Sequence, residues 1–247
     1  MITPEENDLL TQTGKGTPCG ELMRRYWQPA ALSNELAADN SLPVTIFGEE
    51  LILFRDGAGK PALIGRYCAH QGVDMIYGRV EGDGLRCLYH GWLFDNCGKV
   101  VLRGDWLPEK ERRWDVGQSA YPCVDADGVI FTYMGLGEAP LLPPYEFVSL
   151  TAENYAATKV LHGNNYLRAI VEAADPAPGL SRFMMPNLTL FQAASPGAKS
   201  IVRWRVPVDD QSYLEYTFQF AGELPFTAEP HTAAHEVLLR AVQEMRP

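Results

Sequence analysis

Two short segments, CAH and CLYH, each combine a cysteine with a histidine, and sixteen residues separate them. Cysteine thiolates suit iron–sulfur chemistry, and two histidines in place of two cysteines on one iron raise the reduction potential of the cluster. The spacing therefore predicts a [2Fe-2S] cluster with Cys68 and Cys87 on one iron and His70 and His90 on the other.

A mononuclear zinc site is the competing interpretation, because two cysteines and two histidines also suit tetrahedral zinc. Zinc fingers, however, place both cysteines in one pair and both histidines in the other, whereas each pair here is mixed. Gly72, Gly91 and Trp92 stand where loops must close over a cluster, and backbone N–H groups there can donate hydrogen bonds to sulfur. The pattern favours the iron–sulfur cluster.

Short β-rich runs broken by turn residues surround these segments, from about residue 43 to residue 136. A helix over Glu21–Trp27 precedes them, and we expect it to dock its aromatic residues on the body. The proline-rich stretch 139–147 is typical of a linker. The predicted strands are VTIFG, ELILFRD, PALIGRY, GLRCLYHGWLFD, KVVLR and VIFTYMG.

The pattern changes after about residue 150. NYLRAIVEAA has apolar residues at helical spacing and is stopped by Pro176 and Pro178. Three predicted strands follow, and HTAAHEVLLRAVQEM forms a final helix. The fold class is therefore α+β, with a helical segment over 1–35, an all-β domain over 36–147 and a smaller α+β domain over 148–247. The three strands are NLTLFQAA, KSIVRWRVPV and YLEYTFQF.

Composition narrows the function classes. The 247 residues include 31 acidic and 21 basic ones, and the formal net charge of −10 argues against nucleic-acid binding. No apolar run approaches the roughly 20 residues of a membrane helix, and the acidic start does not match a secretory signal. Five cysteines at uneven spacings do not form a disulfide framework. These features predict a cytoplasmic protein without a membrane partner.

A family resemblance rests on CAHQGVDMIYGRVEGDGLRCLYHGWLFD, which closely resembles the Rieske segment of the ring-hydroxylating non-haem iron oxygenases of the phthalate dioxygenase type. The flanking segments GTPCGELMRRYWQPAALSNEL, EELILFRDGAGKPALI and AYPCVDADGVIFTYMG are similar to that family too, so the resemblance covers residues 1 to about 147. It implies a Rieske domain followed by a helix-grip domain, an oxidoreductase of aromatic or heterocyclic compounds, trimer-based assembly, and a reductase or ferredoxin as electron donor.

The second domain departs from the family pattern. The family places an Asp, then a His three residues later and another His five residues after that, around a mononuclear Fe(II). NNYLRAIVEAADPAPGLSRF resembles this segment, with Asp175 at the Asp position but Pro178 and Phe183 at the histidine positions. The long stretch before the landmark VPVDD is also shortened. The resemblance thus implies that this chain does not bind the mononuclear iron, and that Asp175 links its cluster to a full-length catalytic partner subunit.

Two alternatives remain. His231 and His235 lie four residues apart on one helix face, so with Glu229 or Glu236 they could form a relocated iron site in a self-sufficient mono- or dioxygenase. A solvated surface pair is the simpler interpretation of these histidines. The chain could instead be a structural or regulatory subunit of a hetero-oligomer.

Several other residues have modest predicted roles. We expect a free thiol at Cys97, no part in the chemistry for Cys19 and Cys123, and a structural or surface role for His162. Aromatic packing around the cluster is predicted for Tyr89 and Trp92, and polar anchoring of the cluster loop for Asp74 and Arg79.

Overall fold

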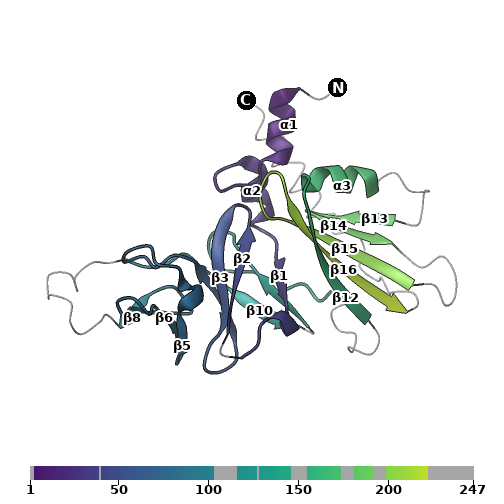
Figure 1. Ribbon diagram of the computed structural model, residues 1–247. Coiled ribbons are helices and arrows are strands. Elements are labelled where there is room, and N and C mark those ends of the chain that lie inside the picture. Colours follow the sequence, from purple (N-terminus) through teal and green to yellow (C-terminus); the bar gives the residue numbers. More distant parts are fainter. Residues whose placement is uncertain are drawn as a thin grey trace.

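The computed structural model describes residues 3–38, 40–102, 116–126, 128–145, 155–173, 181–191 and 199–221, and the statements below refer to these. The described chain contains four antiparallel sheets and three α-helices. Three small sheets form one side of the molecule in Figure 1, and a larger five-stranded sheet forms the other.

The outermost sheet carries one of the two cysteine–histidine segments. Its strand order is β5-β6-β7-β8, and the segment lies between β6 and β7. The short 3-10 helix η2 (Met75–Tyr77) precedes β5. The strands are β5 (Arg79–Glu81), β6 (Gly84–Arg86), β7 (Leu93–Asp95) and β8 (Val100–Leu102).

A second sheet, ordered β2-β3-β4-β9, leads into the other segment at the end of β4. Its residues Ile52, Phe54 and Ile64 form a core with Leu85 and Phe94 of the outer sheet. Burial of this shared apolar surface fixes the two sheets against each other. The strands are β2 (Ser41–Ile46), β3 (Glu49–Arg55), β4 (Pro61–Gly65) and β9 (Ala120–Tyr121).

The third sheet, ordered β1-β11-β10, lies between the cluster side of the molecule and the five-stranded sheet (Figure 1). Phe131 in β11 packs against Trp204 of the large sheet, with ring centroids 5.4 Å apart. The strands are β1 (Gln28–Leu32), β10 (Cys123–Ala126) and β11 (Val129–Thr132), and the 3-10 helix η1 (Ser33–Glu35) follows β1.

The five-stranded sheet is ordered β12-β16-β15-β14-β13. Val202, Trp204 and Val206 are buried on one face of β15, as the period of two predicts. Helix α3 (Tyr166–Ala173) lies beside this sheet in Figure 1. The strands are β12 (Tyr155–His162), β13 (Ser181–Met184), β14 (Leu188–Phe191), β15 (Lys199–Pro207) and β16 (Tyr213–Ala221).

Two helices open the chain, α1 (Pro4–Thr11) and α2 (Pro18–Met23). The predicted helix over 21–27 was misplaced at both ends. It begins earlier because the Thr17 hydroxyl accepts a hydrogen bond from Gly20 and Pro18 follows the cap. It ends at Met23, before the strand that starts at Gln28 and pairs with β11.

The α+β class is confirmed. The predicted linker 139–147 is described up to residue 145, and it packs on the body: the Trp27 indole donates to the Pro140 carbonyl at 3.0 Å. The domain boundaries at 35 and 147 stay a prediction, and the predicted C-terminal helix lies outside the described residues. No described helix has the length and hydropathy required to cross a membrane.

Candidate metal centre

The two cysteine–histidine segments form loops with the same backbone hydrogen bonds. In each loop the cysteine N–H donates to the carbonyl five residues later, and the cysteine carbonyl accepts from the N–H of a glycine four residues later. Both glycines have positive φ, 71° and 69°, which favours a residue without a Cβ. The bonds run from Cys68 to Val73 (2.8 Å), Gly72 to Cys68 (2.7 Å), Cys87 to Trp92 (2.8 Å) and Gly91 to Cys87 (3.0 Å).

The loops pair their side chains by type. His70 Nδ1 and His90 Nδ1 lie 3.0 Å apart, and the thiols of Cys68 and Cys87 are hydrogen-bonded to each other. Each pair is mixed along the sequence, but in space thiol meets thiol and imidazole meets imidazole. This is the arrangement that a [2Fe-2S] cluster with two cysteines on one iron and two histidines on the other requires.

The imidazole separation also fits a single metal position. Two nitrogens that each bind one metal at roughly 2.1 Å in tetrahedral geometry lie about 3.4 Å apart, and the 3.0 Å between the two Nδ1 atoms is within a few tenths of an ångström of that value. Within the described residues, no group of three or more His, Cys, Asp or Glu side chains converges as a metal site. One contact joins the two imidazoles, and another joins the two thiols.

The thiols lie in a polar backbone environment although they are buried. The N–H groups of His70 and Gln71 donate toward Cys68, and those of Tyr89 and His90 donate toward Cys87. The hydrogen bond that Cys68 donates to Cys87 lowers the pKa of the Cys87 thiol. The same hydrogen bond raises the pKa of Cys68, and burial of Cys68 adds to that rise. The backbone donors favour thiolate, which is the form in which a cysteine binds metal.

The histidines reach the surface while the cysteines do not. Cys68 and Cys87 are 3% and 2% exposed, whereas both imidazoles are half-buried. Large apolar side chains are exposed nearby along the same loops and in η2, namely Tyr67, Tyr77, Leu88 and Tyr89. We call these four residues the apolar rim.

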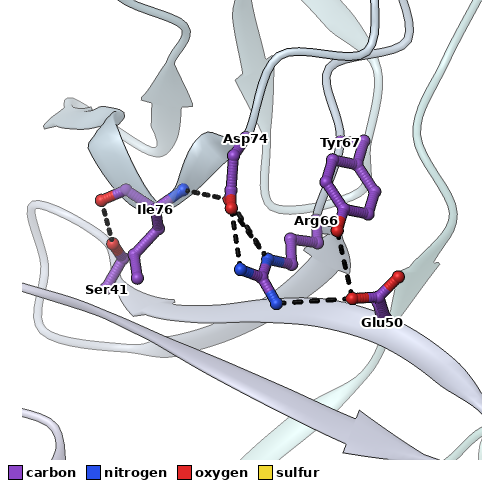
Figure 2. A network of polar contacts seen from close by, with 6 residues as sticks. All are labelled: Ser41, Glu50, Arg66, Tyr67, Asp74 and Ile76. Atoms are coloured by element: carbon purple, nitrogen blue, oxygen red, sulfur yellow. Dashed lines mark hydrogen bonds and ion pairs between the residues drawn. The ribbon is translucent and has the colours of Figure 1, made fainter.

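Ion pairs brace the outer side of the first loop. Asp74 accepts three hydrogen bonds of 2.7 to 3.2 Å from the Arg66 guanidinium, and it caps η2 by accepting from the Ile76 N–H (Figure 2). Arg66 also pairs with Glu50 at 3.4 Å, and Glu50 accepts from the Tyr67 hydroxyl at 3.1 Å (Figure 2). The hydrogen bond with Arg66 lowers the pKa of Asp74. Asp74 therefore anchors the loop, as the sequence suggested.

A matching brace holds the second loop. Glu81 accepts two hydrogen bonds of 2.6 Å from Arg86, whose Nη1 also donates to the Gly91 carbonyl at 2.7 Å. Arg79 adds an exposed ion pair with Glu81 at 3.0 Å. Arg86, rather than Arg79, makes the direct contact with the loop. Sequence reasoning missed Arg66 and Arg86, although an arginine stands one or two residues before each ligand cysteine.

Comparison with known proteins agrees with this geometry. Residues 26–108 match the family described as Rieske [2Fe-2S] domain. The chain contains a Rieske domain. It binds a [2Fe-2S] cluster, as Rieske domains do, and the chain is related to the oxygenase subunits of aromatic-compound oxygenases.

Two curated relatives illustrate the sequence likeness. The 5,5'-dehydrodivanillate O-demethylase oxygenase subunit of Sphingobium sp. (strain NBRC 103272 / SYK-6) is 41% identical over 149 residues, which are 59% of this chain and 35% of that protein. The phenoxybenzoate dioxygenase subunit alpha of Ectopseudomonas oleovorans is 46% identical over 141 residues, 56% of this chain and 34% of that protein. The Rieske part of this chain thus corresponds to about a third of each relative's length.

The likeness in structure extends further along the chain. The oxygenase in an oxygenase–ferredoxin complex of carbazole 1,9a-dioxygenase superposes with a TM-score of 0.68 at 16% identity, covering 93% of this chain and 79% of that one. At this identity the match shows the fold alone. The chain therefore shares the fold of that oxygenase over most of its length, beyond the residues that match the Rieske family.

The other predicted residues lie apart from the centre or outside the described residues. Asp175, Pro178, His231 and His235 belong to the second group, so their predicted roles stay predictions. Phe183 lies on β13 and is 45% exposed. The His162 ring stacks on Tyr213 at 4.8 Å, and the free thiols of Cys19, Cys97 and Cys123 lie away from the ligand loops, in α2, the β7–β8 turn and β10.

Proposed function

We propose that Cys68, His70, Cys87 and His90 ligate the [2Fe-2S] cluster, and that the chain relays electrons within an aromatic-compound oxygenase system. The observation that supports this proposal best is the pairing of thiol with thiol and of imidazole with imidazole. Each pair takes one residue from each loop, so the two pairs provide ligands for two irons. A bound cluster would supply one-electron chemistry at roughly −150 to +300 mV.

The cysteines would hold the cluster on its buried side, and the histidines would hold it on the side that faces solvent. Burial of the thiols keeps water from the inner side, and the backbone N–H groups directed at the sulfurs offset the cost of that burial by favouring thiolate. The half-buried imidazoles of His70 and His90 provide the outer side, next to solvent. An electron can therefore enter or leave through the histidine side without the cluster being opened to bulk water.

The apolar rim supports a docking role for the histidine side. Exposed aromatic and aliphatic side chains on and beside the ligand loops are typical of a surface that a partner covers. Two partners fit this proposal: a reductase or ferredoxin that donates electrons, and a full-length Rieske oxygenase subunit that accepts them in a hetero-oligomer. Relatives of this chain are oxygenase subunits, and its fold matches an oxygenase that binds ferredoxin.

The accepting Fe(II) belongs, in this proposal, to the partner subunit. Pro178 and Phe183 occupy the positions at which the resemblance places ligand histidines, and neither side chain can bind iron. Asp175 would then connect the cluster to the neighbouring iron. The Rieske domain would span residues 36–147 and the helix-grip domain residues 148–247, behind an N-terminal segment of residues 1–35.

Iron analysis and rapid kinetics test the relay. The isolated chain should contain only the two irons of its cluster, and the reduced chain should be reoxidised rapidly only when the full-length subunit and oxygen are both present. Cys68→Ala should lose both irons and the electron transfer. A third iron with turnover by the isolated chain, lost in His231→Ala, would contradict the relay and favour a self-sufficient oxygenase. A cluster that no donor reduces on a catalytic timescale would favour a structural subunit.

A further inference from the structure

Trp92 belongs to one cluster loop but packs on a ligand of the other. Its carbonyl accepts the hydrogen bond of the Cys87 N–H, which ties its backbone to the second loop. Its indole stacks on the imidazole of His70 in the first loop, with ring centroids 4.4 Å apart and planes inclined by only 10°. The side chain is fully buried, so its position is fixed from every side.

The other ligand histidine has a different aromatic neighbour. Tyr89 lies over His90 with ring centroids 4.0 Å apart and planes inclined by 33°. Tyr89 is the residue preceding His90 and is 62% exposed, so this contact stays within one loop and faces solvent. The two histidines thus differ: the buried ring of Trp92 covers His70, and the exposed ring of Tyr89 covers His90.

The polar braces also stay within their own sides of the site. Arg66 and Asp74 flank the first loop, while Arg86 and Glu81 flank the second. They fix where each loop starts and ends, but they do not set the orientation of an imidazole ring. A parallel stacked ring does so, because rotation of His70 about its Cβ–Cγ bond would break the contact with the indole.

We propose that Trp92 is a positioning residue that joins the two cluster loops and fixes the ring plane of His70. By this means His70 Nδ1 is held 3.0 Å from His90 Nδ1, a separation suited to two ligands of one iron. The inference rests on the proposed ligand set. If the four proposed ligands were wrong, the wild-type protein would lack the cluster. If only the positioning role of Trp92 were wrong, the wild-type protein would hold the cluster and the Trp92 variants would behave like wild type.

The test compares three variants of the whole chain. Trp92→Leu keeps an apolar side chain without a ring, Trp92→Phe keeps a smaller ring, and Tyr89→Leu removes the ring that contacts the other histidine. For each we would measure the rate of cluster loss from its visible absorbance under chelator, the reduction potential, and the histidine nitrogen couplings by ENDOR of the reduced protein.

The inference predicts that Trp92→Leu loses its cluster about 10–100-fold faster than wild type, as expected when an outer-shell partner of a metal ligand is removed. Trp92→Phe should recover most of that loss, and Tyr89→Leu should remain near the wild-type rate. In the Trp92 variants the coupling of one histidine nitrogen should change while that of the other stays constant, together with a shift in potential.

Three results would overturn the inference: a Trp92→Leu cluster as long-lived as that of wild type, a Trp92→Phe variant no better than Trp92→Leu, or equal changes at both histidine nitrogens. If Trp92→Leu does not fold, Trp92→Phe alone decides through its ENDOR spectrum. In that variant the smaller ring should alter one coupling, and a spectrum identical to that of wild type would refute the positioning role.

Discussion

At the residue scale, the four candidate ligands were predictable because their chemistry depends on residue type and short spacing. CAH and CLYH already contain the cysteines and histidines. The predicted pairing agrees with the contacts, which join the two thiols across nineteen positions and the two imidazoles across twenty. The sequence could not show that Trp92 contacts His70, because Trp92 lies nearer in sequence to His90.

The contribution of the histidines to the potential gives the first prediction. In His90→Cys a thiolate replaces a neutral imidazole, so the oxidised cluster is favoured and the reduction potential should fall toward the range of all-cysteine clusters, about −400 mV. A spectroelectrochemical titration of the variant and of wild type measures the change. An unchanged or higher potential in a variant that retains its cluster would show that His90 is not a ligand.

At the element scale, a long central strand was found from the sequence and an irregular edge strand was missed. β15 alternates buried and more exposed positions over its first six residues and is buried throughout its last four, and the sequence predicted it nearly to its ends. β12 was missed because it is an edge strand whose consecutive residues Val160 and Leu161 are both exposed, 52% and 63%, which breaks the period of two.

The brace of the first loop gives the second prediction. Arg66 and Asp74 share three hydrogen bonds and are both under a third exposed, so a double-mutant cycle with Arg66→Ala and Asp74→Ala should yield a coupling of about 1 kcal/mol. Urea denaturation of the four proteins measures it. A coupling near zero would mean that the pair does not stabilise the loop.

The same pair predicts an acid dependence. The hydrogen bond with Arg66 lowers the pKa of Asp74, so the folded state binds its proton less readily than the unfolded chain. The stabilisation is therefore complete above the ordinary pKa of an aspartate, about 3.9, and is lost as the pH falls through the lowered value. In Asp74→Asn the free energy of unfolding should depend less on pH in this range. If the variant and wild type lost stability in parallel below about pH 4, Asp74 would not be the source of this pH dependence.

At the scale of the whole molecule, the Rieske side and the five-stranded sheet meet at the turn between β2 and β3. The N–H groups of Phe47 and Gly48 donate to the carbonyls of Pro207 and Val208 at 2.9 and 2.7 Å. Phe47 holds a positive φ of 53°, unusual for a residue with a Cβ, and its side chain is buried. No short sequence pattern indicates a contact of this range.

A buried ion pair beside this turn gives the next prediction. Arg24 pairs with Glu49 at 2.6 Å and is only 4% exposed, and Tyr121 donates to the same carboxylate at 2.6 Å. Arg24→Ala leaves Glu49 without its cation, so the free energy of unfolding should fall by about 3 kcal/mol. The matched control is the neighbouring Arg25→Ala, an exposed residue expected to cost about 0.5 kcal/mol or less. Equal effects of the two substitutions would contradict a structural role for the pair.

The identity of the centre is the claim on which the other proposals depend, and EPR of the reduced, anaerobically purified chain tests it most directly. We predict two irons and two inorganic sulfides per chain, with the signal of a one-electron-reduced [2Fe-2S] cluster coupled to two histidine nitrogens. The signal should disappear in Cys87→Ala. A chain that binds one zinc and no sulfide, or a cluster without nitrogen coupling, would contradict the assignment.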